Sequence, residues 1–242
     1  MTIYIIGEMK IAIIAAMDKE YELLKDLEAS NSKTKYKVVK SGVGKVNAAL
    51  CAHELIKDWG ADLVISTGVG GAIGNGKRIS SNGATDEEMK QDVKVGDVVV
   101  AERAVYHDVY CGEEIAYGQV QDMPLYYEAD KRIVEAAERL GEAMAGFPWG
   151  VIRKGLMVTG DWFVDTVEKA EAIRSKFGDA TVIDMESAAI AQACYKHGKG
   201  FASIRMVSDT PLAGNNREQY DNFWAEAPKW LAESVKMIIN KM

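Results

Sequence analysis

Cysteine, basic charge and long hydrophobic runs are all scarce in this sequence of 242 residues. Its three cysteines, Cys51, Cys111 and Cys194, are odd in number and far apart. This number and spacing fit the reduced, mostly buried thiols of a cytoplasmic protein better than a disulfide framework or a metal site. The formal net charge of −7 at pH 7 argues against binding to nucleic acid, which requires a basic surface. No apolar run is long enough to span a bilayer, so we expect no membrane partner.

Metal ligands and targeting signals are also missing from the sequence. The three histidines, His53, His107 and His197, do not cluster, and no metal-ligand spacing surrounds them. We therefore expect neither a metal nor another cofactor. Residues 1–8 carry no basic segment or cleavage site of a secretion signal, and a strand pattern follows them. We interpret them as an extension that precedes one domain over residues 9–242.

Short apolar, β-branched segments alternate with helical patterns, as is typical of parallel α/β proteins. The strand segments are apolar throughout, which indicates that both faces of the sheet are covered. We therefore predict a single-domain, three-layer α/β/α fold with a mixed, largely parallel central sheet. The predicted strands are Ile11–Ala16, Lys37–Ser41, Leu63–Thr67, Val98–Val105, Gly155–Thr159, Thr181–Asp184 and Phe201–Ser208. The predicted helices are Asp18–Glu28, Gly44–Trp59, Ala129–Ala145, Asp165–Lys176, Glu186–Gly198 and Tyr220–Lys241.

Two segments lack a clear periodicity. Gly74–Asp92 is rich in glycine, serine, asparagine and charge, which predicts a mobile surface loop. Tyr106–Tyr127 contains aromatic, glycine and proline residues, and it is either a long functional loop or an interface segment.

Two acidic residues, Asp184 and Glu186, follow directly on an apolar strand pattern. Burying carboxylates is costly unless a polar group binds them, and ligands of open α/β sheets lie beyond the carboxyl ends of the strands. The pair therefore indicates a ligand site. The alternative is a solvated turn whose acids stabilise the N-terminus of the next helix.

Three further segments place polar or glycine residues beside a predicted strand end. Glu20 lies in the first turn of a helix, where it is either a catalytic base or a partner of the helix dipole. Gly68-Val69-Gly70-Gly71 lets a ligand approach the backbone closely. Arg205, Ser208 and Asp209 end another strand, and a buried aspartate there can act as a general acid, or simply begin a turn. The combination of four such segments favours a catalytic site over the separate structural explanations.

The ordered set of segments resembles the 5′-methylthioadenosine/S-adenosylhomocysteine nucleosidases of the purine nucleoside phosphorylase-like superfamily. The resemblance covers nearly the whole chain from Met9 and rests on the order of its motifs. They are Ile13–Glu20, Lys40–Ala49, Thr67–Gly71, Val95–Val100, Tyr106–Asp108, Tyr117–Gln119, Gly160–Val164, Asp184–Glu186 and Arg205–Asp209.

The resemblance implies hydrolysis of the N-glycosidic bond of an adenine nucleoside by water. Glu20 would activate the water with the help of Arg205. Asp209, supported by Ser208, would protonate N7 of the purine, and Glu186 would bind the ribose hydroxyls. The other implied substrate contacts come from Met185 on the sugar, Phe163 on the adenine ring, the backbone of Val164 at the purine edge, Tyr220 over the 5′ group, and Ile183, Val43, Met17 and Val69. The family is usually homodimeric, and the resemblance implies the same assembly and a role in methionine salvage.

The chain departs from the family pattern in several places. Val69 stands where the family often has a hydroxyl residue, and the stretch between Glu20 and Ser41 is short and predicted to lack a β-hairpin. Residues 74–92 form an insertion. The aromatic and proline residues that a partner subunit contributes in the family have no clear equivalent in Tyr110–Gln121. These departures leave the 5′-substituent and the dimer contact open.

Three other functions remain as alternatives. A phosphorylase of the same superfamily would need more cationic groups near the first strand end, where this chain has Met17-Asp18-Lys19-Glu20. A futalosine-type nucleosidase would share the same catalytic residues. A nucleoside-binding protein without activity would need neither Glu20 nor Asp209.

Overall fold

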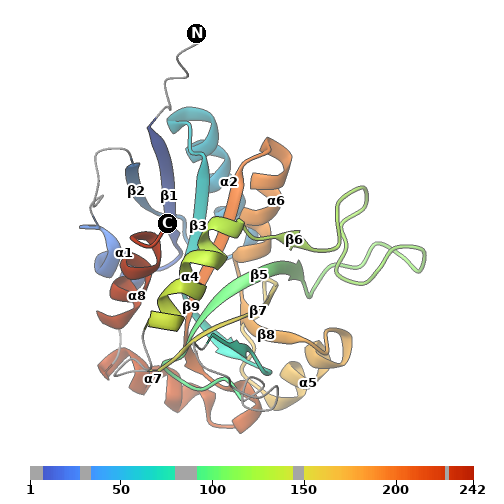
Figure 1. Ribbon diagram of the computed structural model, residues 1–242. Coiled ribbons are helices and arrows are strands. Elements are labelled where there is room, and N and C mark those ends of the chain that lie inside the picture. The colour runs from blue at the N-terminus through green and yellow to red at the C-terminus, as the bar shows by residue number, and fades with distance from the viewer. Residues whose placement is uncertain (1–7, 28–33, 80–91, 144–149, 227–228) are drawn as a thin grey trace.

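The computed structural model describes residues 8–27, 34–79, 92–143, 150–226 and 229–242. Strands and helices alternate along most of the chain (Figure 1). The strands are β1 (Met9–Ala15), β2 (Thr34–Lys40), β3 (Leu63–Ala72), β4 (Lys77–Arg78), β5 (Val98–Tyr106), β6 (Tyr127–Glu128), β7 (Ile152–Thr159), β8 (Ala180–Asp184) and β9 (Gly200–Asp209). The α-helices are α1 (Asp18–Leu24), α2 (Lys45–Glu54), α4 (Lys131–Ala143), α5 (Val167–Lys176), α6 (Ser187–His197), α7 (Asn216–Glu226) and α8 (Lys229–Ile239). A π-helical turn, Leu55–Trp59, extends α2, and a 3₁₀ turn, Pro211–Ala213, follows β9.

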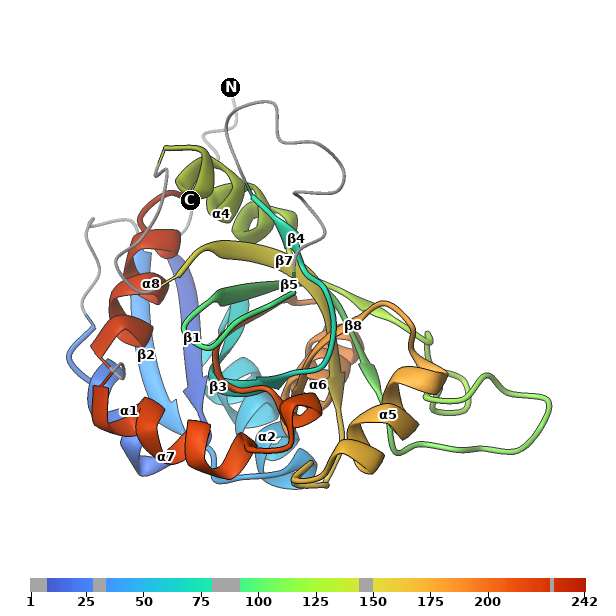
Figure 2. The same cartoon turned by 90° about the horizontal axis from the view of Figure 1, so that it is seen from below.

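The strands form one mixed sheet, and part of it closes into a ring (Figure 2). β1 pairs in parallel with β2 and β3, and β3 pairs in parallel with β9. β9 pairs with β5, β5 with β7, β7 with β8, and β8 with β3. The last residues of β3 therefore lie between β8 and β9, because Gly71 is in register with both Ile183 and Asp209. Ring closure thus brings together strand ends that are far apart in the sequence.

Helices cover both faces of the sheet, which confirms the predicted mixed α/β architecture (Figure 1). α2 and α6 pack together on one face, and α4 and α8 lie on the other. β9 is buried over all but its first residue, as a strand covered on both sides should be. The apolar segments of the sequence are therefore explained by burial from two directions.

The C-terminal helix is predicted wrongly as one segment, Tyr220–Lys241. The structure has two helices there, α7 and α8, and α7 begins four residues earlier, at Asn216. Pro228 lies between them in the sequence. Proline lacks a backbone N–H and collides with the preceding helical turn, so a continuous helix is unfavourable at this point.

The glycine segment lies within a strand, whereas the sequence placed it after one. β3 continues to Ala72 and stays paired with β9, with a bulge between Gly70 and Gly71. A Cβ atom on Gly70 would lie 2.6 Å from Val182 Cγ1 and 2.9 Å from the Ile183 carbonyl oxygen. Glycine is needed here because β8 crosses the end of β3 at close range.

Two short strands, β4 and β6, were not predicted. β4 belongs to the Gly74–Asp92 segment and pairs with β7, so the described part of this segment is ordered by the sheet. The prediction for its centre, residues 80–91, lies outside the described residues. The same holds for residues 1–7 of the proposed extension. Between Glu20 and Ser41 the described residues contain only α1 and β2, and residues 28–33 lie outside them.

Candidate active site

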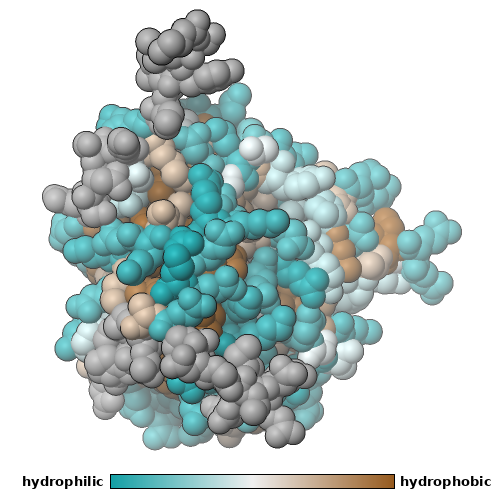
Figure 3. All heavy atoms as spheres, in the orientation of Figure 1, coloured by the Kyte–Doolittle hydropathy of each residue, from teal (hydrophilic) through white to brown (hydrophobic). Residues whose placement is uncertain are grey.

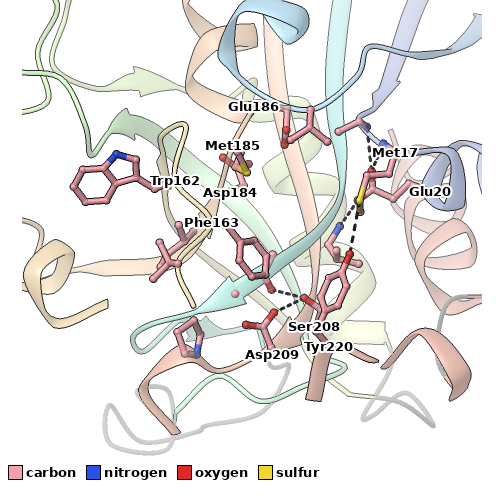
Figure 4. Close-up of a pocket in the computed structure, with 18 residues that line it drawn as sticks. Met17, Glu20, Trp162, Phe163, Asp184, Met185, Glu186, Ser208, Asp209 and Tyr220 are labelled. Atoms are coloured by element: carbon pink, nitrogen blue, oxygen red, sulfur yellow. Dashed lines mark hydrogen bonds between the residues drawn. The ribbon is translucent and has the colours of Figure 1, made fainter. Parts of the chain in front are cut away.

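A cavity of about 380 Å³ opens where the ends of β3, β8 and β9 meet the loops after β1, β2 and β7 (Figure 4). Every residue predicted to form the site lines this cavity except Arg205. The predicted residues that line it are Met17, Glu20, Val43, Val69, Phe163, Val164, Ile183, Met185, Glu186, Ser208, Asp209 and Tyr220. The fold therefore brings these residues together around one space, and their individual roles stay predictions.

Glu20 is held by backbone N–H groups from the loop after β1 and from β3. Its Oε2 accepts hydrogen bonds of 3.0 Å from the amides of Ala16 and Met17, and its Oε1 accepts one of 2.9 Å from Val69 N. Burial raises the pKa of Glu20 above its usual value, although the charge of Arg205 and the three amides act in the opposite direction. A buried carboxylate with a raised pKa and a fixed orientation is suited to accept a proton.

Val69 shows how the missing hydroxyl affects this arrangement. Val69 departs from the family pattern in its side chain, but it donates its backbone N–H to Glu20 and it lines the cavity. The contact that orients the carboxylate is therefore independent of the side chain at this position.

Arg205 lies behind the cavity wall and is 1% exposed. Its Nε donates to Asp184 Oδ2 at 2.9 Å, and its Nη2 donates to Ser66 Oγ at 2.8 Å and to Glu186 Oε2 at 3.3 Å. Although burial opposes its charge, the acids Asp184, Glu186 and Glu20 hold the pKa of Arg205 above its usual value. Arg205 is thus the buried counter-ion of three acids and does not line the cavity itself.

Asp184 organises the start of α6. Its Oδ1 accepts hydrogen bonds from Thr159 Oγ1 at 2.5 Å and from Ser187 N at 3.2 Å, and its Oδ2 accepts from the Ser187 hydroxyl. Together with the Arg205 contact, these bonds satisfy both of its oxygens. Asp184 therefore has the structural role that its position before a helix indicates, even though it lines the cavity as well.

Glu186 directly precedes α6, and its side chain lies at the cavity (Figure 4). Its Oε1 accepts a hydrogen bond of 3.0 Å from Gly44 N, so the loop after β2 fixes one side of the carboxylate. Burial raises the pKa of Glu186 to about 7, opposed by Arg205 and assisted by the nearby charges of Asp184 and Glu20. The group can therefore change protonation state near neutral pH.

Asp209 ends β9 on the opposite side of the cavity from Glu186 (Figure 4). Its Oδ1 accepts a hydrogen bond of 2.7 Å from Ser208 Oγ. Burial raises the pKa of Asp209, and hydrogen bonds from Ser208 and Asn216 oppose that shift. A raised pKa keeps part of the population protonated as the pH increases, which a general acid requires.

Aromatic rings form another wall of the cavity. The rings of Phe163 and Tyr220 meet edge to face, with centroids 6.4 Å apart at 84°. The Tyr220 hydroxyl donates to the sulfur of Met17 at 3.7 Å. Phe163 is 51% exposed although it lies beside an apolar cavity, which leaves its face free to stack on a planar ligand.

Some site residues were missed by the sequence interpretation. Trp162 lines the cavity next to Phe163, and Asn216 donates to the Val164 carbonyl oxygen at 3.3 Å besides facing Asp209. Asn216 was missed because the helix that begins with it was predicted to start at Tyr220. Ser66 lies mid-strand, and no local pattern marks it as a partner of Arg205.

Among the described residues, no group of three or more histidine, cysteine or acidic residues is placed to hold a metal ion. In the same part of the chain, no helix has the length and apolar character needed to cross a membrane.

Comparisons with known proteins place the chain among nucleoside-processing enzymes. The model of the phosphorylase superfamily matches residues 10–240. The 5′-methylthioadenosine/S-adenosylhomocysteine nucleosidase of Lysinibacillus sphaericus is 34% identical, over 94% of this chain and 97% of the relative. The corresponding nucleosidase of Anoxybacillus flavithermus is 32% identical, over 97% of this chain and 99% of the relative.

Solved structures of nucleosidases also match this chain. The S-adenosylhomocysteine nucleosidase of Streptococcus pyogenes matches with a TM-score of 0.78 and 33% identity, covering 98% of both chains. The nucleosidase of Neisseria meningitidis, solved with methylthio-immucillin-A, matches with a TM-score of 0.79 and 30% identity, over 96% of this chain and 99% of the other. The futalosine hydrolase of Helicobacter pylori has a TM-score of 0.80 at only 21% identity, which indicates a shared fold.

Proposed function

This chain belongs to the phosphorylase superfamily and, within it, to the 5′-methylthioadenosine/S-adenosylhomocysteine nucleosidases, and we propose that it hydrolyses the N-glycosidic bond of such adenine nucleosides. The products are adenine and the corresponding 5-thioribose. One observation carries the choice of water as the nucleophile. The described residues that line the cavity include the carboxylates Glu20, Asp184, Glu186 and Asp209, and no lysine, arginine or histidine.

Water attacks from the side of the cavity that Glu20 occupies. The oxygen of the water forms a bond to C1′ of the ribose while the bond from C1′ to N9 of adenine breaks. Glu20 accepts the proton that the water loses. Positive charge develops on the ribose in the transition state, and the carboxylate of Glu186, held by Gly44 N and Arg205, stabilises it while binding the ribose hydroxyls.

Asp209 makes adenine a better leaving group. It donates a proton to N7, so that the electron pair of the broken bond is left on a neutral base. Phe163 stacks on the adenine ring, and the backbone of Val164 reads its edge. The raised pKa of Asp209 supports this role, because the group has to carry a proton before the bond breaks. Glu20 gains one proton from water and Asp209 gives one proton to adenine, so the reaction consumes no net protons. Proton exchange then returns Glu20 to the carboxylate and Asp209 to the acid before the next turnover.

The phosphorylase alternative is disfavoured by the charges of the cavity. Phosphate is an anion and needs cationic or well-placed backbone donors. The guanidinium of Arg205 lies behind the cavity wall, and it is buried and already bound to Asp184, Ser66 and Glu186. The futalosine alternative is not favoured either, since the relatives at 32% and 34% identity described above are methylthioadenosine/adenosylhomocysteine nucleosidases. A binding protein without activity would have no use for Glu20 and Asp209.

The experiment measures base release from a panel of nucleosides with and without phosphate. The panel contains methylthioadenosine, adenosylhomocysteine, adenosine, inosine and aminodeoxyfutalosine. We expect adenine from the first two at a rate that phosphate does not change, and ¹⁸O from labelled water in the sugar product. Release that depends on phosphate and yields a sugar 1-phosphate would establish a phosphorylase. Binding of the nucleosides without any base release would establish a binding protein.

The proposal includes a homodimer. Val46 and Leu50 are 69% and 58% exposed, and they border a groove of about 720 Å³ between α2, α6 and the base of the segment after β5. That segment, residues 107–126, extends away from the body of the molecule (Figure 1), and hydrophobic residues are visible on this protruding part (Figure 3). Exposed apolar surface of this kind supports contact with a second copy. Light scattering after gel filtration should give a molar mass of twice that of the chain. In Leu50→Lys the measured mass should fall toward that of a single chain.

We place this reaction in methionine salvage in the cytoplasm. The chemistry fits, because it removes adenine from thioether nucleosides. The free thiols of Cys51 and Cys194 are buried and suited to a reducing compartment. Fractionation of cells with an antibody against the chain tests the compartment, and accumulation of methylthioadenosine after deletion of the gene tests the metabolic role.

A further inference from the structure

A cluster of three charged residues joins the two loops that border the cavity from opposite sides. Lys45 follows the loop after β2, Asp108 follows β5, and Asp161 lies in the loop after β7. Lys45 Nζ donates to Asp108 Oδ2 at 2.6 Å, and Asp161 N donates to the same oxygen at 2.9 Å. Asp161 Oδ1 in turn accepts from Lys45 N at 2.8 Å. These three contacts form a closed cycle between three chain segments.

Each loop carries cavity residues immediately beside the cluster. Gly44, which precedes Lys45, donates its N–H to Glu186, and Val43 lines the cavity. Trp162 and Phe163 follow Asp161 and line the cavity from the other side. The cluster thus lies between the part of the site proposed to bind ribose and the part proposed to bind adenine.

The geometry leaves little freedom for this junction. Gly44 has φ of +95°, and a Cβ atom there would lie 3.0 Å from Asp161 Oδ1, so the two loops touch through backbone and carboxylate. The Asp108 side chain is only 9% exposed, and its ion pair with Lys45 is therefore better shielded from water than the surface pairs of this protein. None of the three side chains lines the cavity, so they act through the loops and not on the substrate.

We propose that Lys45, Asp108 and Asp161 are positioning residues that set the distance between the ribose-binding and adenine-binding sides of the cavity. This inference rests on the proposed function, since it assigns the two sides to the two parts of a nucleoside. A nucleoside spans both sides and needs the correct spacing, whereas free adenine contacts only one. Loss of the cluster therefore weakens nucleoside binding selectively.

The test compares two ligands by calorimetry, free adenine and methylthio-immucillin-A, with the KM of methylthioadenosine as a third readout. In Lys45→Met, we expect the Kd of the nucleoside analogue and the KM to rise by about 10- to 100-fold, the range that small misplacements of a site produce. The Kd of adenine should stay within about twofold of the wild type. Lys45→Arg keeps the charge and should restore most of the nucleoside affinity, and Asp108→Asn should behave like Lys45→Met.

Lys154→Met is the matched control. Lys154 makes an ion pair of the same length, 2.6 Å, with Glu138 on the far side of the sheet and does not line the cavity. It should leave all three values unchanged. Equal weakening of adenine and of the nucleoside analogue in Lys45→Met would overturn the inference, and so would no change in either. The proposed function is tested separately. A wild-type protein that releases no adenine would refute the proposed function, whereas the binding comparison does not depend on turnover and tests the positioning role alone.

Discussion

The Ser208 hydroxyl donates a hydrogen bond of 2.7 Å to Oδ1 of the neighbouring Asp209, inside a site where burial raises the pKa of that aspartate. Burial and the Ser208 hydroxyl therefore act in opposite directions on the pKa of Asp209. Burial favours the protonated acid, and the hydroxyl stabilises the carboxylate that remains after the proton has been transferred.

Replacing Asp209 by Asn should abolish most of the activity without disturbing the fold. Asn has nearly the same shape but cannot supply a proton, and general acid catalysis contributes about 10²- to 10⁴-fold. Steady-state assays of adenine release should show this loss in kcat. Circular dichroism should be unchanged. Asp221→Asn, at an exposed position of α7, is the control and should keep full activity. Full activity in Asp209→Asn would exclude the proposed acid.

Replacing Ser208 by Ala should move the alkaline limb of the kcat profile to higher pH. The hydroxyl lowers the pKa of Asp209, so its removal leaves burial less opposed and raises that pKa further. Because the protonated form is the active acid, activity persists to higher pH in the variant. A profile measured from pH 5 to 10 checks the direction. An alkaline limb that stays in place or moves down would show that Asp209 does not determine it.

Replacing Glu186 by Gln should change how stability depends on pH. The pKa of Glu186 is raised by burial to about 7 in the folded protein, from an ordinary value of 4.5. A raised pKa stabilises the folded state at low pH, and this contribution is lost as the pH rises through 7. Between pH 5 and 8 the wild type should lose about 2 kcal/mol relative to Glu186→Gln.

Urea unfolding at both pH values measures the difference. Glu171→Gln, at an exposed position of α5, should run parallel to the wild type and serves as the control. Parallel pH dependence of Glu186→Gln and the wild type would mean that the carboxylate titrates normally.

Replacing Gly68 by Ala should abolish activity by displacing Glu20. Gly68 has φ of +151°, and a Cβ atom there would overlap the Glu20 carboxylate and lie 2.7 Å from Arg205 Nη1. Gly198→Ala is the matched control, because Gly198 also has positive φ but open space around the added atom. Gly198→Ala should lose about 1 kcal/mol of stability for its left-handed backbone, and Gly68→Ala should lose at least as much because its φ also favours glycine. Only Gly68→Ala should lose more than about 100-fold in kcat/KM. Equal activity in the two variants would show that a Cβ atom at position 68 does not displace the Glu20 carboxylate.

Much of the site could be predicted because its residues lie at strand ends that local patterns reveal. The apolar run before Asp184-Met185-Glu186 marks the end of β8, and Asp209 ends β9. The resemblance to a family then assigned each acid a separate role. These features depend on a few consecutive residues, which is why sequence is sufficient for them.

The remaining features depend on contacts between distant segments. Gly70 looked like a turn residue, but it continues β3 through its pairing with β9, and the close approach of β8 requires glycine there. Arg205 looked like a residue of the cavity, but Asp184 and Ser66 hold it behind the wall. The ring of strands itself follows from β9 pairing with both β3 and β5, and the strand pattern carries no information on such pairing.

Ring closure leaves few open strand edges, and β2 has the longest one in the part of the chain that the structure describes. Among the described strands, β2 pairs with β1 alone, and an open edge of this kind can accept a strand from another molecule. Lys35, Lys37 and Lys40 are exposed along it. Lys35 and Lys40 form ion pairs with Glu8 and Asp18, and a second copy added edge to edge would have to displace the water around these exposed charged groups. The lysines of β2 thus protect the protein against aggregation through its sheet, independently of the chemistry at the other end of the strands.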